Sequence, residues 1–149
     1  MIVMDYVKDN NNLYGSAQWS CGEYDNINII ANSGKAKITE QFSTIGEKSI
    51  AFQQSNPANY GYFYVDSTNT LNSGENYTVS LDCYCPDSNF TFIVRQDGEL
   101  SRVIIPQNPS MQHISLSFTS NRSASFRIQF FNDISDSRIF IDNLSCIKL

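Results

Sequence analysis

Asp142 is the residue whose chemistry is hardest to place. It lies in the last stretch of the chain, residues 138–149, whose alternating pattern predicts a strand. In that strand, Phe140, Asp142, Leu144 and Cys146 would share one face. A carboxylate in such an apolar row is costly unless it is paired, hydrogen-bonded or bound to a cation. Two interpretations stay open: a calcium ligand that ties the chain ends together, or a carboxylate at the rim of the core, bonded to backbone amides or facing a basic side chain.

The four cysteines also leave two interpretations open. Cys21, Cys83, Cys85 and Cys146 permit two disulfides in three connectivities, or four buried reduced thiols. Cys83 and Cys85 would lie on the same strand face, so a bond between them would require distortion. Zinc is disfavoured because the spacing is C-x-C and because His113 is the single histidine.

Catalytic motifs are not recognisable in the sequence. A glycosidase needs two carboxylates across the scissile bond, and none of the fifteen acidic residues lies in such a motif. A Ser-His-Asp triad would depend entirely on His113, which has no nucleophile elbow beside it. The sequence has neither a phosphate-binding glycine loop nor a dinucleotide fingerprint. We therefore expect a protein that is not an enzyme.

A set of aromatic and planar polar side chains is better suited to binding. Tyrosine faces stack on pyranose rings, and planar polar groups hydrogen-bond to hydroxyls. If the sheet that carries them is curved, they would converge on one concave face. The alternative is that they are ordinary exposed strand residues, or that the tyrosines pack across strands or in an oligomer interface. The candidates, all expected on strand faces away from the core, are Tyr62, Tyr64, Asp82, Tyr84, Arg95, Arg127 and Gln129.

The candidate residues lie in segments that are predicted to be β-strands, and such segments occur throughout the chain. The clearest period-2 pattern runs over residues 76–85, and residues 90–95 repeat it before a tight turn at Asp97-Gly98. Alternation in residues 27–31 and 36–38, around Asn-Ser-Gly, predicts a hairpin. About ten short strands result, without a convincing helix. This pattern predicts an all-β fold, a jelly-roll β-sandwich of two antiparallel sheets.

Length and charge limit the functional classes. The 149 residues suit a single domain spanning 1–149. The net charge of −5, without a Lys/Arg-rich run, argues against nucleic acid or anionic membrane as partners. No apolar run approaches the roughly 20 residues that span a bilayer, and the N-terminus is not a signal peptide. Abundant neutral polar residues suit an extracellular or cell-surface module of a larger protein, and a virion component is the second possibility.

The order of four segments resembles a known family. They are Trp19, Gly46-Glu-Lys-Ser-Ile-Ala-Phe52, Gly74-Glu-Asn-Tyr-Thr-Val-Ser-Leu81 and Phe140-Ile-Asp-Asn-Leu-Ser145. This order is similar to that in jelly-roll carbohydrate-binding modules of families 4, 9 and 22, which have a galactose-binding-domain-like fold. The resemblance covers residues from about position 12 to the C-terminus.

The resemblance implies a non-catalytic module that binds a poly- or oligosaccharide, within a larger exported enzyme or surface adhesin. It also implies a structural calcium ion at Asp142, with further ligands from the backbone near Lys48 and from the N-terminal loop. In that loop this chain has Asp-Asn-Asn-Asn-Leu instead of the family's N-G-x-F-E-like stretch, so the candidate carboxylates are Asp9 and, as an alternative, Asp5. The alternative function is a structural or assembly domain of a surface or viral tail protein without sugar affinity.

Overall fold

The computed structural model describes residues 27–31, 34–39, 42, 44, 49–54, 62–67 and 70–149. Every regular element among these residues is a β-strand, and none of their segments forms a helix that could cross a membrane. The strands are β1 (Ile27–Ala31), β2 (Gly34–Thr39), β3 (Ser49–Gln54), β4 (Tyr62–Ser67), β5 (Asn76–Tyr84), β6 (Phe90–Gln96), β7 (Gly98–Ile105), β8 (Gln112–Thr119), β9 (Arg127–Phe131) and β10 (Arg138–Lys148).

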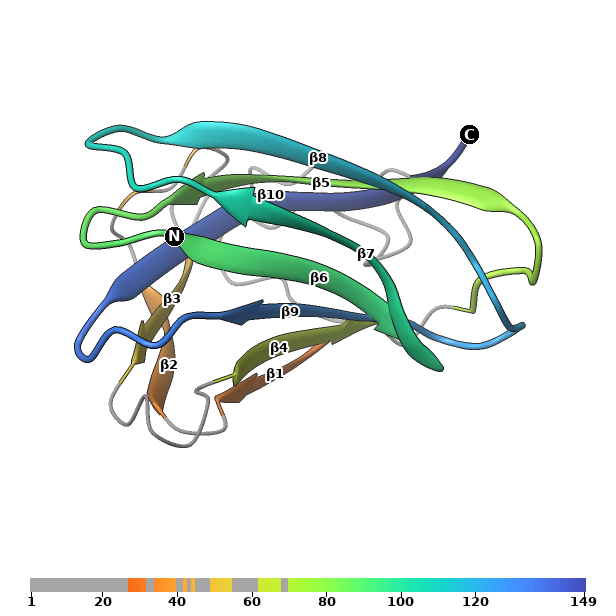
Figure 1. Cartoon of the computed structure of the whole chain (residues 1–149), viewed down its shortest axis with the longest axis horizontal. Coiled ribbons are helices and arrows are strands. Elements are labelled where there is room, and N and C mark those ends of the chain that lie inside the picture. Colours follow the sequence, from red (N-terminus) through yellow and green to blue (C-terminus); the bar gives the residue numbers. More distant parts are fainter. Residues whose placement is uncertain are drawn as a thin grey trace, which may run out of the picture.

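The ten strands form two antiparallel five-stranded sheets, so the predicted all-β sandwich is confirmed. Sheet 1 has the order β1-β4-β9-β6-β7, and sheet 2 has the order β2-β3-β10-β5-β8. Figure 1 shows β4, β9 and β6 as one group of neighbouring strands and β10, β5 and β8 as another. Apart from β2–β3 and β6–β7, the neighbouring strands of each sheet are not consecutive in the chain, so the sandwich depends on long-range pairing.

The core lies between the two sheets and follows from the alternation of the strands. In β5, Val79, Leu81 and Cys83 face the core while the residues between them are half-buried. Across the core, Phe52 of β3 stacks on Phe63 of β4, with ring centroids 4.7 Å apart. Burying one such side chain completely contributes about 1.5–3 kcal/mol. The predicted inward faces of β5 and β9 are therefore confirmed.

The turn at the end of β6 is confirmed as well, because Gly98 has φ 86°, a conformation that glycine adopts without steric cost. The hairpin expected over residues 27–38 is wrong. β1 pairs with β4 in sheet 1, whereas β2 pairs with β3 in sheet 2. A turn motif specifies that the chain changes direction, but it does not specify that the flanking strands pair with each other.

The expected face of the last strand is confirmed for Leu144 and Cys146 but wrong for Phe140 and Asp142. Ile139 and Ile141 face the core in the first half of β10, and Leu144 and Cys146 face it in the second half. The switch occurs at a β-bulge between Asp142 and Ser145, where Asn143 has φ 50°. One extra residue in a strand moves all following side chains to the opposite face. Phe140 and Asp142 therefore lie on the outer face of sheet 2.

The described cysteines are the buried reduced thiols of the second interpretation. Cys83, Cys85 and Cys146 are buried reduced thiols, while Cys21 lies outside the described residues. A hydrogen bond with Cys83, together with burial, raises the pKa of Cys85 far above its ordinary value. Burial raises the pKa of Cys146 to about 12. Because the thiolate is the reactive form, Cys85 and Cys146 belong to the inert, structural kind.

Candidate functional site

The outer face of sheet 1 brings several predicted binding residues together. Pairing of β4 with β9 places Tyr64 opposite Gln129 and places Asp66 opposite Arg127. Pairing of β9 with β6 then places Arg127 opposite Arg95. These side chains alternate with core residues of the same strands, so they point away from the core.

Arg127 is the centre of this surface. Its Nε donates to Asp66 Oδ1 at 2.6 Å and its Nη2 donates to Asp66 Oδ2 at 2.8 Å. The same guanidinium lies over the ring of Tyr64, with Cζ 4.1 Å from the ring centroid. The hydrogen bonds that Arg127 donates to Asp66 raise the pKa of Arg127. A bidentate pair and a cation–π contact together fix the orientation of the Tyr64 ring and of the guanidinium.

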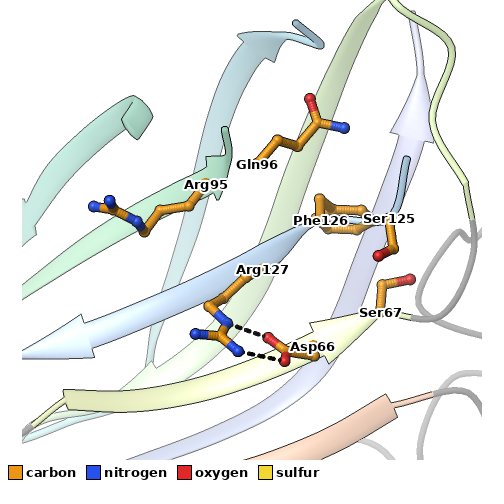
Figure 2. Close-up of a pocket in the computed structure, with 7 residues that line it drawn as sticks. All are labelled: Asp66, Ser67, Arg95, Gln96, Ser125, Phe126 and Arg127. Atoms are coloured by element: carbon orange, nitrogen blue, oxygen red, sulfur yellow. Dashed lines mark hydrogen bonds and ion pairs between the residues drawn. The ribbon is translucent and has the colours of Figure 1, made fainter. Parts of the chain in front are cut away.

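A pocket of about 570 Å³ opens beside this pair. It lies where β4 and β6 end and where β9 begins (Figure 2). Its volume is within the range typical of small-molecule sites. The lining residues are Asp66, Ser67, Arg95, Gln96, Ser125, Phe126 and Arg127.

Gln96 holds the loop that forms one side of the pocket. Its Nε2 donates to the backbone carbonyls of Arg122 at 3.2 Å and Ala124 at 3.1 Å. Its Oε1 accepts from Ser120 Oγ at 2.9 Å and from the Asn121 backbone N–H at 3.0 Å. One amide therefore engages four successive or near-successive residues of the loop. This arrangement positions Ser125 and Phe126 at the pocket.

The other residues predicted for sheet 1 contribute differently. Gln129 lies on the outer face but is only 4% exposed, so most of its surface is covered. Tyr62 occupies the next outer position of β4, opposite Phe131, and its side chain lies outside the described residues. Of the seven predicted binding residues, Tyr64 contacts Arg127, and Arg95 and Arg127 line the pocket.

The expectation that all seven residues share one concave face is wrong. Asp82 and Tyr84 belong to β5, which lies in sheet 2, and they project from the opposite side of the sandwich. The Tyr84 ring packs against Phe42 and Phe140 at centroid distances of 4.6 and 5.9 Å. Alternation places a residue on an inner or an outer face, but it does not indicate which sheet the strand joins.

Asp142 lies next to Asp82 on the outer face of sheet 2 and is 0% exposed. Its Oδ2 accepts the backbone N–H of Thr44 at 2.6 Å. The Thr44 hydroxyl donates to Asp82 Oδ2 at 2.6 Å and lies 3.4 Å from Asp142 Oδ2. The bond to a backbone amide agrees with the second interpretation of Asp142.

The other contacts of Asp82 tie neighbouring strands together. His113 Nδ1 lies 2.8 Å from Asp82 Oδ1, and Asn143 Nδ2 donates to Asp82 Oδ2 at 3.3 Å. Over the stretches that the structure describes, no three His, Cys, Asp or Glu side chains form a group that could hold a metal ion. The remaining expected ligands, Lys48 and Asp9, lie outside these stretches.

Sequence reasoning missed five of the seven residues that line the pocket: Asp66, Ser67, Gln96, Ser125 and Phe126. Asp66 follows Tyr62 and Tyr64 at the same period-2 spacing, so its position on the outer face could have been derived. Gln96 carries no comparable signal, because its hydrogen-bond partners lie 24 to 28 residues further along the chain.

Comparisons with known proteins define the fold. No family model and no curated protein sequence matches this chain. Among solved structures, the enzymatically active domain of bacteriophage CBA120 tailspike protein 4 superposes with a TM-score of 0.69 at 10% identity. It covers 93% of this chain, which spans only 22% of that protein.

Two carbohydrate-binding modules are similar over nearly their whole length. A family 61 module in complex with β-1,4-galactotriose has a TM-score of 0.61 at 14% identity, covering 99% of this chain and 100% of the module. The CBM22-1 xylan-binding domain of Xyn10C from Paenibacillus barcinonensis has a TM-score of 0.64 at 12% identity, covering 80% and 85%. The chain therefore has the jelly-roll fold of carbohydrate-binding modules, as the sequence motifs indicated.

Proposed function

We propose that this chain is a non-catalytic carbohydrate-binding module within a larger exported enzyme or surface adhesin. The saccharide would lie on the outer face of sheet 1, over Tyr64 and into the adjacent pocket. The observation that carries this proposal is the fixed Tyr64–Arg127–Asp66 arrangement beside a pocket of about 570 Å³. An oriented aromatic face next to convergent polar groups is what recognition of a sugar ring requires.

A saccharide screen with two matched tyrosine variants tests the proposal. The full chain is screened against neutral and acidic polysaccharides, and affinity for the best one is measured for Tyr64→Ala and Tyr84→Ala. An aromatic anchor at an interface is typically worth 2 kcal/mol or more, so Tyr64→Ala should weaken binding by roughly 30-fold. Tyr84→Ala removes the same side chain from the opposite sheet and should leave affinity unchanged. Equal affinity of Tyr64→Ala and the unmodified chain would rule out this site.

The second candidate function is a structural or assembly domain without sugar affinity, in a surface or viral tail protein. Its support is the similarity to a tailspike domain, of which this chain matches a small part. The same screen separates the two functions. A blank result on every polysaccharide, with an oligomer that grows with protein concentration, would favour assembly.

We also propose a structural calcium ion at Asp142. Asp82 and Asp142, joined through the Thr44 hydroxyl, form a set of hard oxygen donors of the kind that calcium prefers. Asp9 and the backbone near Lys48 would supply the further ligands. An ion bound only by the native state would stabilise the fold by mass action.

A further inference from the structure

We infer that the pocket beside Arg127 binds an acidic saccharide, whose carboxylate or sulfate group is held by Arg95. This inference rests on the proposed function and names the class of sugar. The first observation is that two positively charged side chains lie side by side. Arg95 of β6 lies directly opposite Arg127 of β9 in the sheet register. Like charges at directly opposite strand positions are destabilising unless other groups compensate them.

Only one of these two arginines is neutralised within the described part of the chain. Both carboxylate oxygens of Asp66 are engaged by Arg127. Figure 2 shows these two hydrogen bonds, with the Arg95 guanidinium lying apart from them. Among the described residues, Arg95 has no hydrogen-bond or ion-pair partner within the usual distances, although it lines the same pocket.

The acidic residue nearest to Arg95 in register has another partner. Glu99 of β7 lies opposite Arg95, past a bulge at Val94. Both of its carboxylate oxygens are hydrogen-bonded to Arg102, through Nε at 2.9 Å and through Nη2. Arg95 contributes only a longer-range attraction, which is the smallest of the effects that lower the pKa of Glu99.

The local charge is therefore opposite to the charge of the whole chain. Three guanidinium groups, those of Arg95, Arg102 and Arg127, face two carboxylates, Asp66 and Glu99, which leaves a net +1 on this part of the face. The chain as a whole carries −5. A planar guanidinium binds a carboxylate or sulfate through two parallel hydrogen bonds, which suits an acidic sugar better than a neutral one. The Ser125 side chain at the same pocket offers a hydroxyl to such a ligand.

Matched pairs of polysaccharides test this inference. Each acidic polysaccharide is presented beside its carboxyl-reduced or desulfated form, and dissociation constants are measured for both members of the best pair. Because Arg95 would form a hydrogen-bonded charge pair with the anionic group, we expect the acidic member to bind roughly 10- to 100-fold more tightly than the neutral member. Arg95→Gln should remove most of this preference, because the acidic member then loses the guanidinium that its anionic group binds. Comparing the carboxylated with the sulfated pairs identifies which anion is bound.

A charge-matched control and a stability measurement complete the design. Lys148→Gln changes the net charge equally, at an exposed position of sheet 2 paired with Glu75, and should leave the preference intact. Arg95→Gln should keep or slightly raise the melting temperature, because it removes a like-charged cross-strand pair. Equal binding of both members by the unmodified chain, or an unchanged preference in Arg95→Gln, would overturn the inference but leave the carbohydrate-binding proposal standing. Binding of neither member of any pair would overturn both.

Discussion

Replacing Gln96 by alanine is expected to lower the free energy of unfolding by at least about 2 kcal/mol, because four hydrogen bonds contribute roughly 0.5–1.5 kcal/mol each. These bonds hold residues 120–124 against the end of β6. For a domain of this size the melting temperature should fall by roughly 5–15 °C. Saccharide affinity should fall as well, since the loop carries Ser125 to the pocket. Thermal unfolding and binding are measured on the same preparation.

Gln112→Ala is the matched control for this prediction. It makes the same chemical change in β8, where the Gln112 side chain donates one hydrogen bond, to the Pro106 carbonyl at 2.8 Å. Its cost should stay below about 1.5 kcal/mol, without an effect on binding. If Gln96→Ala and Gln112→Ala lower the free energy of unfolding equally, the four hydrogen bonds of Gln96 do not hold the loop of residues 120–124 as we describe.

Asp142→Ala is expected to destabilise the chain in two separable ways. Without calcium, loss of the bond to the Thr44 amide should cost about 1.5–3 kcal/mol, the usual contribution of a hydrogen bond to a charged group. With calcium at 100 times its dissociation constant, the unmodified chain should gain about 2.7 kcal/mol, or roughly 5–10 °C in melting temperature. The alanine variant should gain nothing. Melting curves in calcium and in chelator give both effects.

The control for this prediction is Ser145→Ala, in the same strand. Ser145 lies just beyond the bulge and shares one hydrogen bond of 2.7 Å with Ser80. It should keep the full calcium response and lose at most about 1.5 kcal/mol. If chelator leaves the melting curve of the unmodified chain unchanged, the calcium proposal is wrong, while the role of Asp142 in binding Thr44 stands.

The strand content and the inward faces of β5 and β9 could be predicted from sequence, because the side-chain period of two follows directly from strand geometry. The face of β10 could not be predicted across its whole length. Asn143, in a left-handed conformation, is the extra residue of the bulge in β10. Side chains after it therefore point to the opposite face from the one that the pattern before it predicts. Asn tolerates this conformation better than most residues, but a single Asn is too common to be read as a bulge.

The candidate site was only partly predictable, because the sequence pattern does not show which strands pair with each other. Tyr64, Arg95 and Arg127 were identified because their types and outer positions suit sugar binding. Asp82 and Tyr84 were grouped with them because alternation does not specify sheet membership. The contact between Asp66 and Arg127 joins strands 61 residues apart, and it appears only once β4 has paired with β9. Long-range pairing is therefore the information that a single sequence does not supply.

The most direct test of where the saccharide binds is a titration followed by backbone amide chemical shifts, using the best polysaccharide fragment from the screen. We expect the largest shift changes at Tyr64, Gln96 and Arg127, with β5 and β10 of sheet 2 unaffected. Changes concentrated around Asp82 and Tyr84 on the outer face of sheet 2 would contradict the assignment of the site to sheet 1.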